Sequence, residues 1–148
     1  MDSVYKRVLK FKQKYPGTVA WRLAQNSSVI EKHLNPGEKV LYAFAAQKND
    51  NVFNFFETAV VALTSKRILI GRKRVFFGYF LNSITPDMFN DMKVSGGLIW
   101  GKVYIDTVKE FVTLSNLSNE ALTEIETEIT TYMMEEKKKY ANELSDGD

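Results

Sequence analysis

The central part of the chain is a series of short apolar runs separated by turn residues. Two of these runs, residues 59–63 and 68–70, flank the polar sequence TSKR at residues 64–67. Two β-branched runs around a charged break of that length are typical of a β-hairpin. The same pattern continues on both sides and predicts seven strands, over residues 39–47, 58–64, 67–72, 74–84, 88–94, 98–105 and 111–114. Their connections are short, so we expect antiparallel pairing, because parallel pairs need long crossovers.

Helical spacing of apolar residues occurs at both ends of the chain. The first predicted helix ends at the Pro-Gly pair of residues 16–17 and has an apolar face made of Val4, Val8, Phe11 and Tyr15. A second helix is expected between a cap at Thr18 and the stop at residues 35–37 (NPG). A last helix begins near Ser118, and its apolar stripe consists of Leu122, Ile125, Ile129 and either Tyr132 or Met133.

Composition excludes several classes of protein. The chain of 148 residues has no cysteine, which excludes disulfides, thiolate zinc sites and cysteine nucleophiles. No apolar run approaches the roughly 18 residues that a membrane span requires, and the first residues lack the apolar core of a signal peptide. We therefore expect a cytoplasmic protein, with attachment to the periphery of a membrane as the alternative.

Charge is unevenly distributed along the chain. Residues 1–34 hold seven Lys or Arg against two Asp or Glu, whereas residues 116–148 hold three against nine. A basic beginning and an acidic end can simply keep the protein soluble, or the basic part can bind an anionic partner. Both interpretations stay open at this point.

Three local sequences resemble those of bacterial pleckstrin-homology-like (PH-like) domains. Residues 35–41 (NPGEKVL) resemble their opening "L-x-P-G-E-x-V". Residues 62–69 (ALTSKRIL) resemble their hairpin "A-L-T-[ST]-x-R-[IL]-[IL]", which eukaryotic GRAM domains share in part. Residues 84–89 (ITPDMF) stand where these domains have "I-P-Y-x-x-I", with one inserted residue and no Tyr.

The resemblance covers about residues 35–140 and implies a fold. That fold is α+β and mainly β: a seven-stranded antiparallel barrel or sandwich capped by a C-terminal α-helix, here preceded by two N-terminal helices. We accordingly divide the chain into an N-terminal helical extension (1–34), a PH-like domain (35–140) and a flexible tail (141–148).

The sequence shows no arrangement of residues suited to catalysis. His33 is the only histidine, and no carboxylate is spaced to orient it as a catalytic base. No cluster of His and carboxylate residues suggests a metal, and the glycines near residues 96–101 do not form a phosphate-binding loop. We expect a non-enzymatic protein without catalytic residues, cofactor or metal. We also expect no nucleic-acid binding, because the aromatic residues of 72–77 (RKRVFF) are assigned to the core.

Many eukaryotic relatives bind phosphoinositides through basic residues of the first hairpin. Lys48 matches the first of those positions, but no Lys or Arg follows until Lys66. A phosphate pocket needs several converging cations. We therefore expect no phosphoinositide pocket of the usual kind.

Two sets of residues are candidate contact surfaces. The first is an apolar cluster in the first strand connection, consisting of Val52, Phe53, Phe55 and Phe56. It either marks a partner-binding or membrane-binding surface or folds back over the barrel mouth or the N-terminal helices. The second set offers anionic contacts on the first helix and in a turn: Lys6, Lys10, Lys14, Arg72, Lys73 and Arg74. For the turn the commoner alternative is ordinary solvated charge, and for the helix it is packing onto the barrel. Arg67 is expected to have a structural role, with its guanidinium bound to carbonyls or a carboxylate.

These observations predict a binding module that mediates protein–protein interaction or self-assembly, and some bacterial relatives are thought to form homo-oligomers. The alternative is peripheral binding to an anionic membrane through the basic N-terminal helix and its adjacent aromatic residues.

Overall fold

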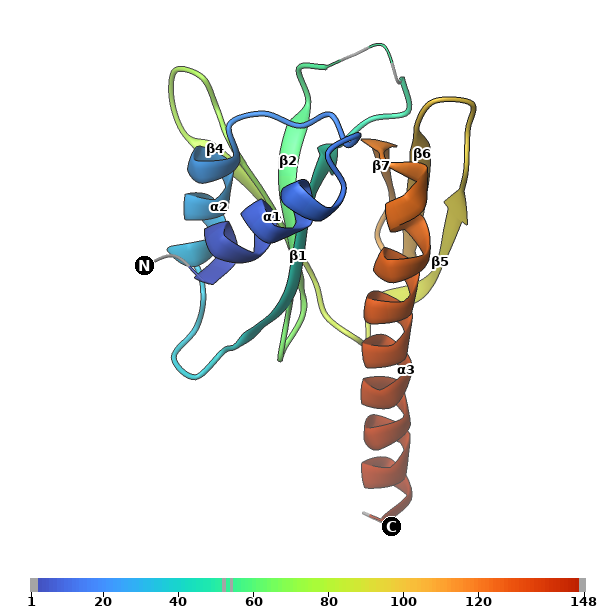
Figure 1. The fold of residues 1–148 in the computed structure, drawn as a ribbon. Coiled ribbons are helices and arrows are strands. Elements are labelled where there is room, and N and C mark those ends of the chain that lie inside the picture. The colour runs from blue at the N-terminus through green and yellow to red at the C-terminus, as the bar shows by residue number, and fades with distance from the viewer. Residues whose placement is uncertain (1–2, 52, 54, 147–148) are drawn as a thin grey trace.

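Figure 1 shows a computed structural model of the chain, which describes residues 3–51, 53 and 55–146. The predicted seven strands form one sheet in which all neighbouring strands are antiparallel, in the order β4-β3-β2-β1-β7-β6-β5. The strands are β1 (Val40–Gln47), β2 (Thr58–Thr64), β3 (Ile68–Lys73), β4 (Tyr79–Ile84), β5 (Phe89–Ser95), β6 (Gly101–Thr107) and β7 (Phe111–Leu117). The helices are α1 (Ser3–Lys14), α2 (Leu23–Glu31) and α3 (Leu122–Asp146), the last preceded by the short 3₁₀ helix η1 (Asn119–Ala121).

The sheet is open, so the predicted barrel does not close. β4 and β5 are its two edges, and they do not pair with each other. β1 and β7 are joined only where Gln47 lies opposite Ser115, and the sheet therefore divides at this point into a β1–β4 half and a β5–β7 half. A helix, not a further strand pair, covers the space between the halves (Figure 1).

That helix is α3, whose apolar stripe fills the core as predicted. Leu122, Ile125, Ile129 and Met133 are buried against side chains of both halves, such as Phe44 and Ile105. The C-terminal part of the helix projects past the sheet, at the end opposite the highest loops (Figure 1). It remains helical to Asp146, through residues where we expected a flexible tail to begin.

α1 and α2 pack on the outer face of the β1–β4 half. Val4 and Val8 of α1 and Ile30 of α2 form a second core with Ala43, Ala45 and other strand residues. Both faces of this half are therefore covered, which explains why every residue of β2 is buried. The packing of the N-terminal helices, which the sequence left open, leaves no apolar face of α1 free for another partner.

Three predicted boundaries are wrong. The sixth strand, predicted over residues 98–105, is Gly101–Thr107, so residues 98–100 belong to the β5–β6 loop. The second helix and the fourth strand differ for local reasons. Residues 18–22 are not helical, because their backbone bonds to the sheet: the Val19 N–H donates to the Asn116 carbonyl and the Trp21 N–H to the Thr58 hydroxyl. The fourth strand begins at Tyr79 and not at residue 74, because residues 74–78 form a turn. The turn is closed by a bond from the Arg74 N–H to the Gly78 carbonyl, and Gly78 has φ +75°.

Candidate binding surface

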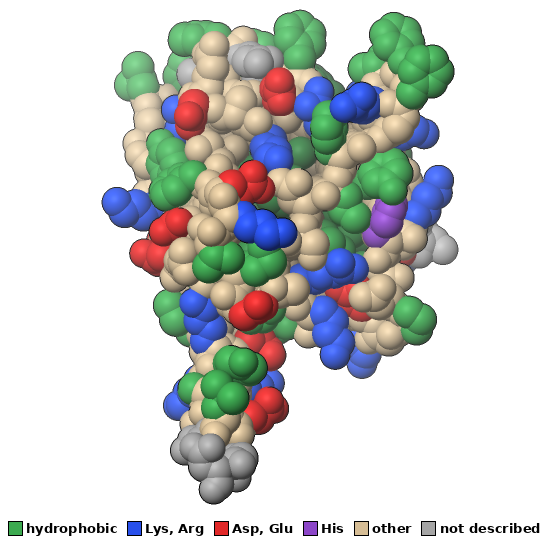
Figure 2. Space-filling model, turned by 180° about the vertical axis from the view of Figure 1, so that it is seen from behind, with side chains coloured by type: hydrophobic (Ala, Val, Ile, Leu, Met, Phe, Trp, Pro, Cys, Tyr) green, Lys and Arg blue, Asp and Glu red, His purple; other side chains and the backbone are tan. Residues whose placement is uncertain are grey.

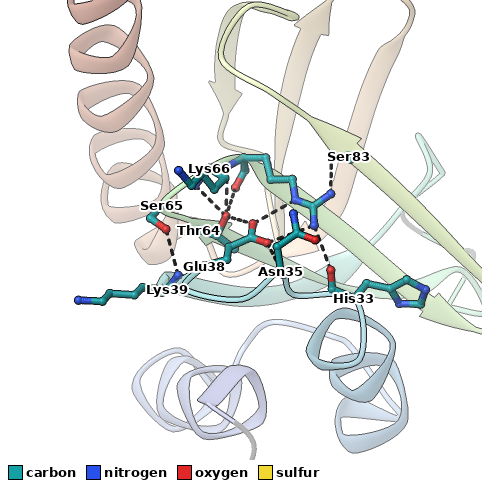
Figure 3. Close-up of polar contacts among 9 residues, drawn as sticks. His33, Asn35, Glu38, Lys39, Thr64, Ser65, Lys66 and Ser83 are labelled. Carbon is teal, nitrogen blue, oxygen red and sulfur yellow. Dashed lines mark hydrogen bonds and ion pairs between the residues drawn. The ribbon is translucent and has the colours of Figure 1, made fainter.

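The basic turn between β2 and β3 is a structural ion-pair network (Figure 3). The Arg67 guanidinium donates to both carboxylate oxygens of Glu38, at 3.0 and 3.2 Å. It also donates to the His33 carbonyl at 3.0 Å and to the Ser83 hydroxyl at 3.2 Å. The predicted structural role of Arg67 is confirmed, and its charge is used within the fold.

Glu38 is buried beside this guanidinium. Burial alone would raise the pKa of its carboxyl group. Hydrogen bonds from Arg67, from the Asn35 N–H and from the Thr64 hydroxyl, together with the Arg67 charge, outweigh burial and hold that pKa below its ordinary value. The carboxylate is therefore ionised in the folded protein at neutral pH.

Three strand connections and one linker meet at a single end of the molecule, which we call the loop end. They are the β1–β2, β3–β4 and β5–β6 loops, which rise to the same end in Figure 1, and the α1–α2 linker. The Trp21 indole N–H of the linker donates to the Phe55 carbonyl at 3.0 Å. The rings of Phe55 and Trp100 lie 6.0 Å apart, and Lys102 donates to the Asp50 carbonyl at 2.6 Å. The β1–β2 loop thus connects the linker to the β5–β6 loop.

The loop end exposes large apolar side chains on separate tips. On the β3–β4 tip, Phe76 is 88% exposed and Phe77 is 85% exposed. On the other loops, Phe56 (85%) and Leu98 (100%) are exposed to a similar degree. In Figure 2, separate groups of hydrophobic side chains stand out along the upper edge of the molecule. The apolar residues exposed on these loops and on the linker are Trp21, Phe53, Phe56, Val75, Phe76, Phe77, Leu98 and Ile99.

Cations accompany these apolar tips. Lys73 and Arg74 are exposed beside the β3–β4 tip, and the Arg74 guanidinium lies 4.3 Å from the centre of the Phe80 ring. Arg72 is held by Glu57 in an ion pair of 3.1 Å. The loop end therefore combines exposed apolar side chains with the two exposed positive charges of Lys73 and Arg74.

Comparison with known families identifies the fold. The family model described as "Bacterial PH domain" matches residues 34–131. The chain belongs to the bacterial PH domain family. One similar solved structure is a pleckstrin homology domain from Shewanella amazonensis SB2B, with 13% identity and a TM-score of 0.40, covering 66% of this chain and 75% of that one. A search of curated proteins finds no match.

This PH domain has a small cavity of about 240 Å³ near the first hairpin. Lys48 and Arg72 line it, but so does Glu57, which bonds to Arg72. The Glu57 carboxylate already accepts the hydrogen bond from the Arg72 guanidinium that a phosphate would need. The sequence-based expectation that the usual phosphoinositide pocket is missing stays a prediction, and this arrangement supports it.

The candidate residues of the sequence fall at separate places in the PH domain. Phe53 and Phe56 are exposed at the loop end, Phe55 is half-buried against Trp100, and Val52 lies outside the described residues. Among the described residues of this cluster, Phe55 shows the folding back that was the alternative, with its ring against Trp100. Lys73 and Arg74 join the loop end.

The α1 lysines, in contrast, are not part of the loop end. Lys6, Lys10 and Lys14 are exposed on a helix that crosses the outer face of the sheet, and Lys14 pairs with Glu124 of α3 at 2.5 Å. Phe11, one of the aromatic residues of this helix that the alternative function would place in a membrane, is only 4% exposed. α1 is fixed to the sheet by this ring and cannot offer it to a bilayer.

Sequence reasoning missed the β3–β4 tip, because it assigned the aromatics of residues 72–77 to the core. Gly78 was the available signal, since a glycine after three bulky apolar residues suits a turn with positive φ. Among the described residues, no group of three His, Cys, Asp or Glu could hold a metal. Within that same part of the chain, no helix is long and apolar enough to cross a membrane.

Proposed function

We propose that this PH domain is a peripheral membrane-binding module that docks on an anionic lipid surface through its loop end. The observation that supports it best is the set of large apolar side chains exposed on separate loop tips at one end. Exposed apolar groups of this extent are typical of contact surfaces. Separate prongs suit a fluid bilayer, which can close around each tip without a matching surface.

The charges and the tryptophans support the same interpretation. Lys73 and Arg74 lie beside the apolar tip of the β3–β4 loop, and a basic residue near an anionic membrane contributes about 1 kcal/mol. Both tryptophans of the chain, Trp21 and Trp100, belong to the loop end. Tryptophan favours the boundary between lipid and water because its ring is apolar and its N–H is polar.

The proposal moves the membrane contact from the N-terminal helix, where the sequence suggested it, to the loops. It assigns no catalytic step, cofactor or metal to the PH domain. A protein partner for the loop end, which the sequence favoured, is the competing outcome of the test below.

Co-sedimentation with lipid vesicles tests the proposal. Vesicles of phosphatidylcholine alone are compared with vesicles that also contain phosphatidylserine, at low and high salt. We expect binding to the mixed vesicles at low salt and weaker binding at high salt, because salt screens the attraction to the lipid charge. The double variant Phe76→Ser/Phe77→Ser should lose most of this binding.

The matched control is Val108→Ser/Phe111→Ser, which also removes two exposed apolar side chains. Val108 lies in the β6–β7 turn, where its N–H bonds to the Met88 carbonyl, and Phe111 is the first residue of β7; both lie away from the loop end. The control should bind vesicles as the wild type does. Equal binding by both double variants, or no binding of the wild type at low salt, would overturn the proposal and favour a protein partner.

A further inference from the structure

The two edges of the sheet differ in their protection against pairing. β5 carries Asp91 and Lys93, and charged residues on an edge strand oppose pairing with another chain. β4 has the sequence YFLNSI, without any charged residue. Tyr79 and Phe80 of this strand are 52% and 46% exposed, large fractions for aromatic residues of a strand. An uncharged apolar edge is a template for another strand.

The hydrogen-bond register shows which backbone groups of β4 are free to pair. Arg74 and Gly78 form a hydrogen-bonded pair, and such pairs alternate along an antiparallel ladder. In the register of β3 and β4, every second residue of β4 then directs its N–H and C=O groups toward β3. These residues are Phe80, Asn82 and Ile84. Those of Tyr79, Leu81 and Ser83 point to the free edge. Within the described residues, no other segment forms a backbone hydrogen bond with them.

We propose that β4 pairs antiparallel with β4 of a second copy of this chain. With Leu81 opposite Leu81, Tyr79 of each copy faces Ser83 of the other, so all three outward residues find partners. Pairing of a strand with itself gives a two-fold interface in which both copies use the same surface. The second copy is thus joined through backbone bonds, and its sheet continues this one.

Charge complementarity favours a second copy as the occupant. Antiparallel pairing carries the basic tip of one copy, with the exposed Lys73 and Arg74, toward the β4–β5 turn of the other. That turn presents the exposed carboxylate of Asp87. The same contact is formed twice by symmetry. A parallel arrangement of the two strands would place the basic tips side by side, where they repel each other.

This inference does not depend on the proposed membrane contact, because the backbone of β4 that pairs lies beside the loop tips; the two proposals share only the cations Lys73 and Arg74. Two-fold pairing also turns the two loop ends in opposite directions. The pairing is therefore tested in solution, without lipid, and its failure leaves the membrane proposal untouched.

Sedimentation velocity over a series of protein concentrations is the test. We expect the wild type to be a reversible dimer. Leu81→Lys places two like charges directly opposite each other, which opposes pairing. Tyr79→Pro removes an outward N–H donor at an edge position where proline is tolerated. Both variants should be monomeric at concentrations where the wild type is dimeric, with circular dichroism confirming that they are folded.

The control is Asn90→Lys, which adds a charge to the exposed side of β5 and should leave the dimer unchanged. Hydrogen exchange gives a second measurement that does not depend on a variant. The amides of Tyr79, Leu81 and Ser83 should gain protection as the wild-type concentration rises. A wild type that stays monomeric, or a dimer that persists in both β4 variants, would overturn the inference.

Discussion

Arg67 and Glu38 join two segments that are far apart in the sequence. Glu38 belongs to the NPGE segment before β1, and Arg67 belongs to the TSKR turn between β2 and β3. These are the two stretches on which the resemblance to PH-like domains rested, and in the structure they meet in one network (Figure 3). Sequence reasoning found the role of Arg67, because an arginine fork suits a carboxylate. It could not name Glu38, since only the fold brings the two residues together.

The network predicts a large loss of stability in Glu38→Gln. The Arg67 side chain is only 17% exposed, so its charge would remain largely buried without a carboxylate. Breaking a buried pair by removing one partner costs about 3 kcal/mol or more. Lys66→Gln changes an exposed charge of the same turn and should stay within about 0.5 kcal/mol of the wild type. Urea unfolding of both variants provides the comparison.

The same pair gives a pH dependence of defined sign. The pKa of the Glu38 carboxyl is lower in the folded state than its ordinary value of 4.5. The unfolded chain therefore takes up the proton first, and the contribution of Glu38 is complete above that value and is lost as pH falls through the folded pKa. The difference in unfolding free energy between the wild type and Glu38→Gln should shrink on acidification. A difference that is constant from neutral to acidic pH would contradict this account.

At the scale of elements, α2 lies close to β3 because β3 contains a glycine. A Cβ atom at Gly71 would stand 2.7 Å from Cγ1 of Ile30 and 3.2 Å from the Asn26 carbonyl oxygen, both on α2. The backbone of Gly71 has no positive φ, so its small size and not its flexibility is what the position requires.

Gly71→Ala should therefore destabilise the docking of α2. Overpacking of this kind costs about 1–3 kcal/mol. Gly17→Ala is the matched control, because its added Cβ would meet the nearest atoms at an ordinary 3.8 Å. Thermal unfolding should show a lower midpoint for Gly71→Ala only. Equal midpoints for the two variants would mean that α2 does not need the close approach.

The elements that the sequence predicted well are those whose pattern is local. Short apolar runs separated by turn residues predicted all seven strands, and β2 was predicted with its observed bounds. The second helix was predicted too early because Thr18 looks like a helix cap, whereas its hydroxyl accepts a bond from the Ser118 N–H, on a segment distant in sequence. Phe76 and Phe77 were wrongly assigned to the core, because an apolar side chain in the sequence does not show whether the residue lies in a strand or at the tip of a turn.

The whole molecule has two different ends. The loop end carries exposed aromatic residues and the cations Lys73 and Arg74. α3 projects from the opposite end (Figure 1), and it belongs to the segment in which acidic residues outnumber basic ones. In the proposed function, an anionic membrane would attract the first end and repel the second, which would favour one orientation of the PH domain on a bilayer. The sequence showed this asymmetry of charge, but only the fold places the apolar tips with the cations.

Tryptophan fluorescence with brominated lipids tests the central claim most directly, because Trp21 and Trp100 both lie at the loop end. Bromine on the acyl chains quenches a tryptophan that approaches the bilayer interior, and Trp21→Phe leaves Trp100 as the single reporter. The account predicts quenching of the wild type by vesicles that contain phosphatidylserine, and its loss in Phe76→Ser/Phe77→Ser. Vesicle-bound protein whose tryptophans are not quenched would contradict it, because another surface would then face the membrane.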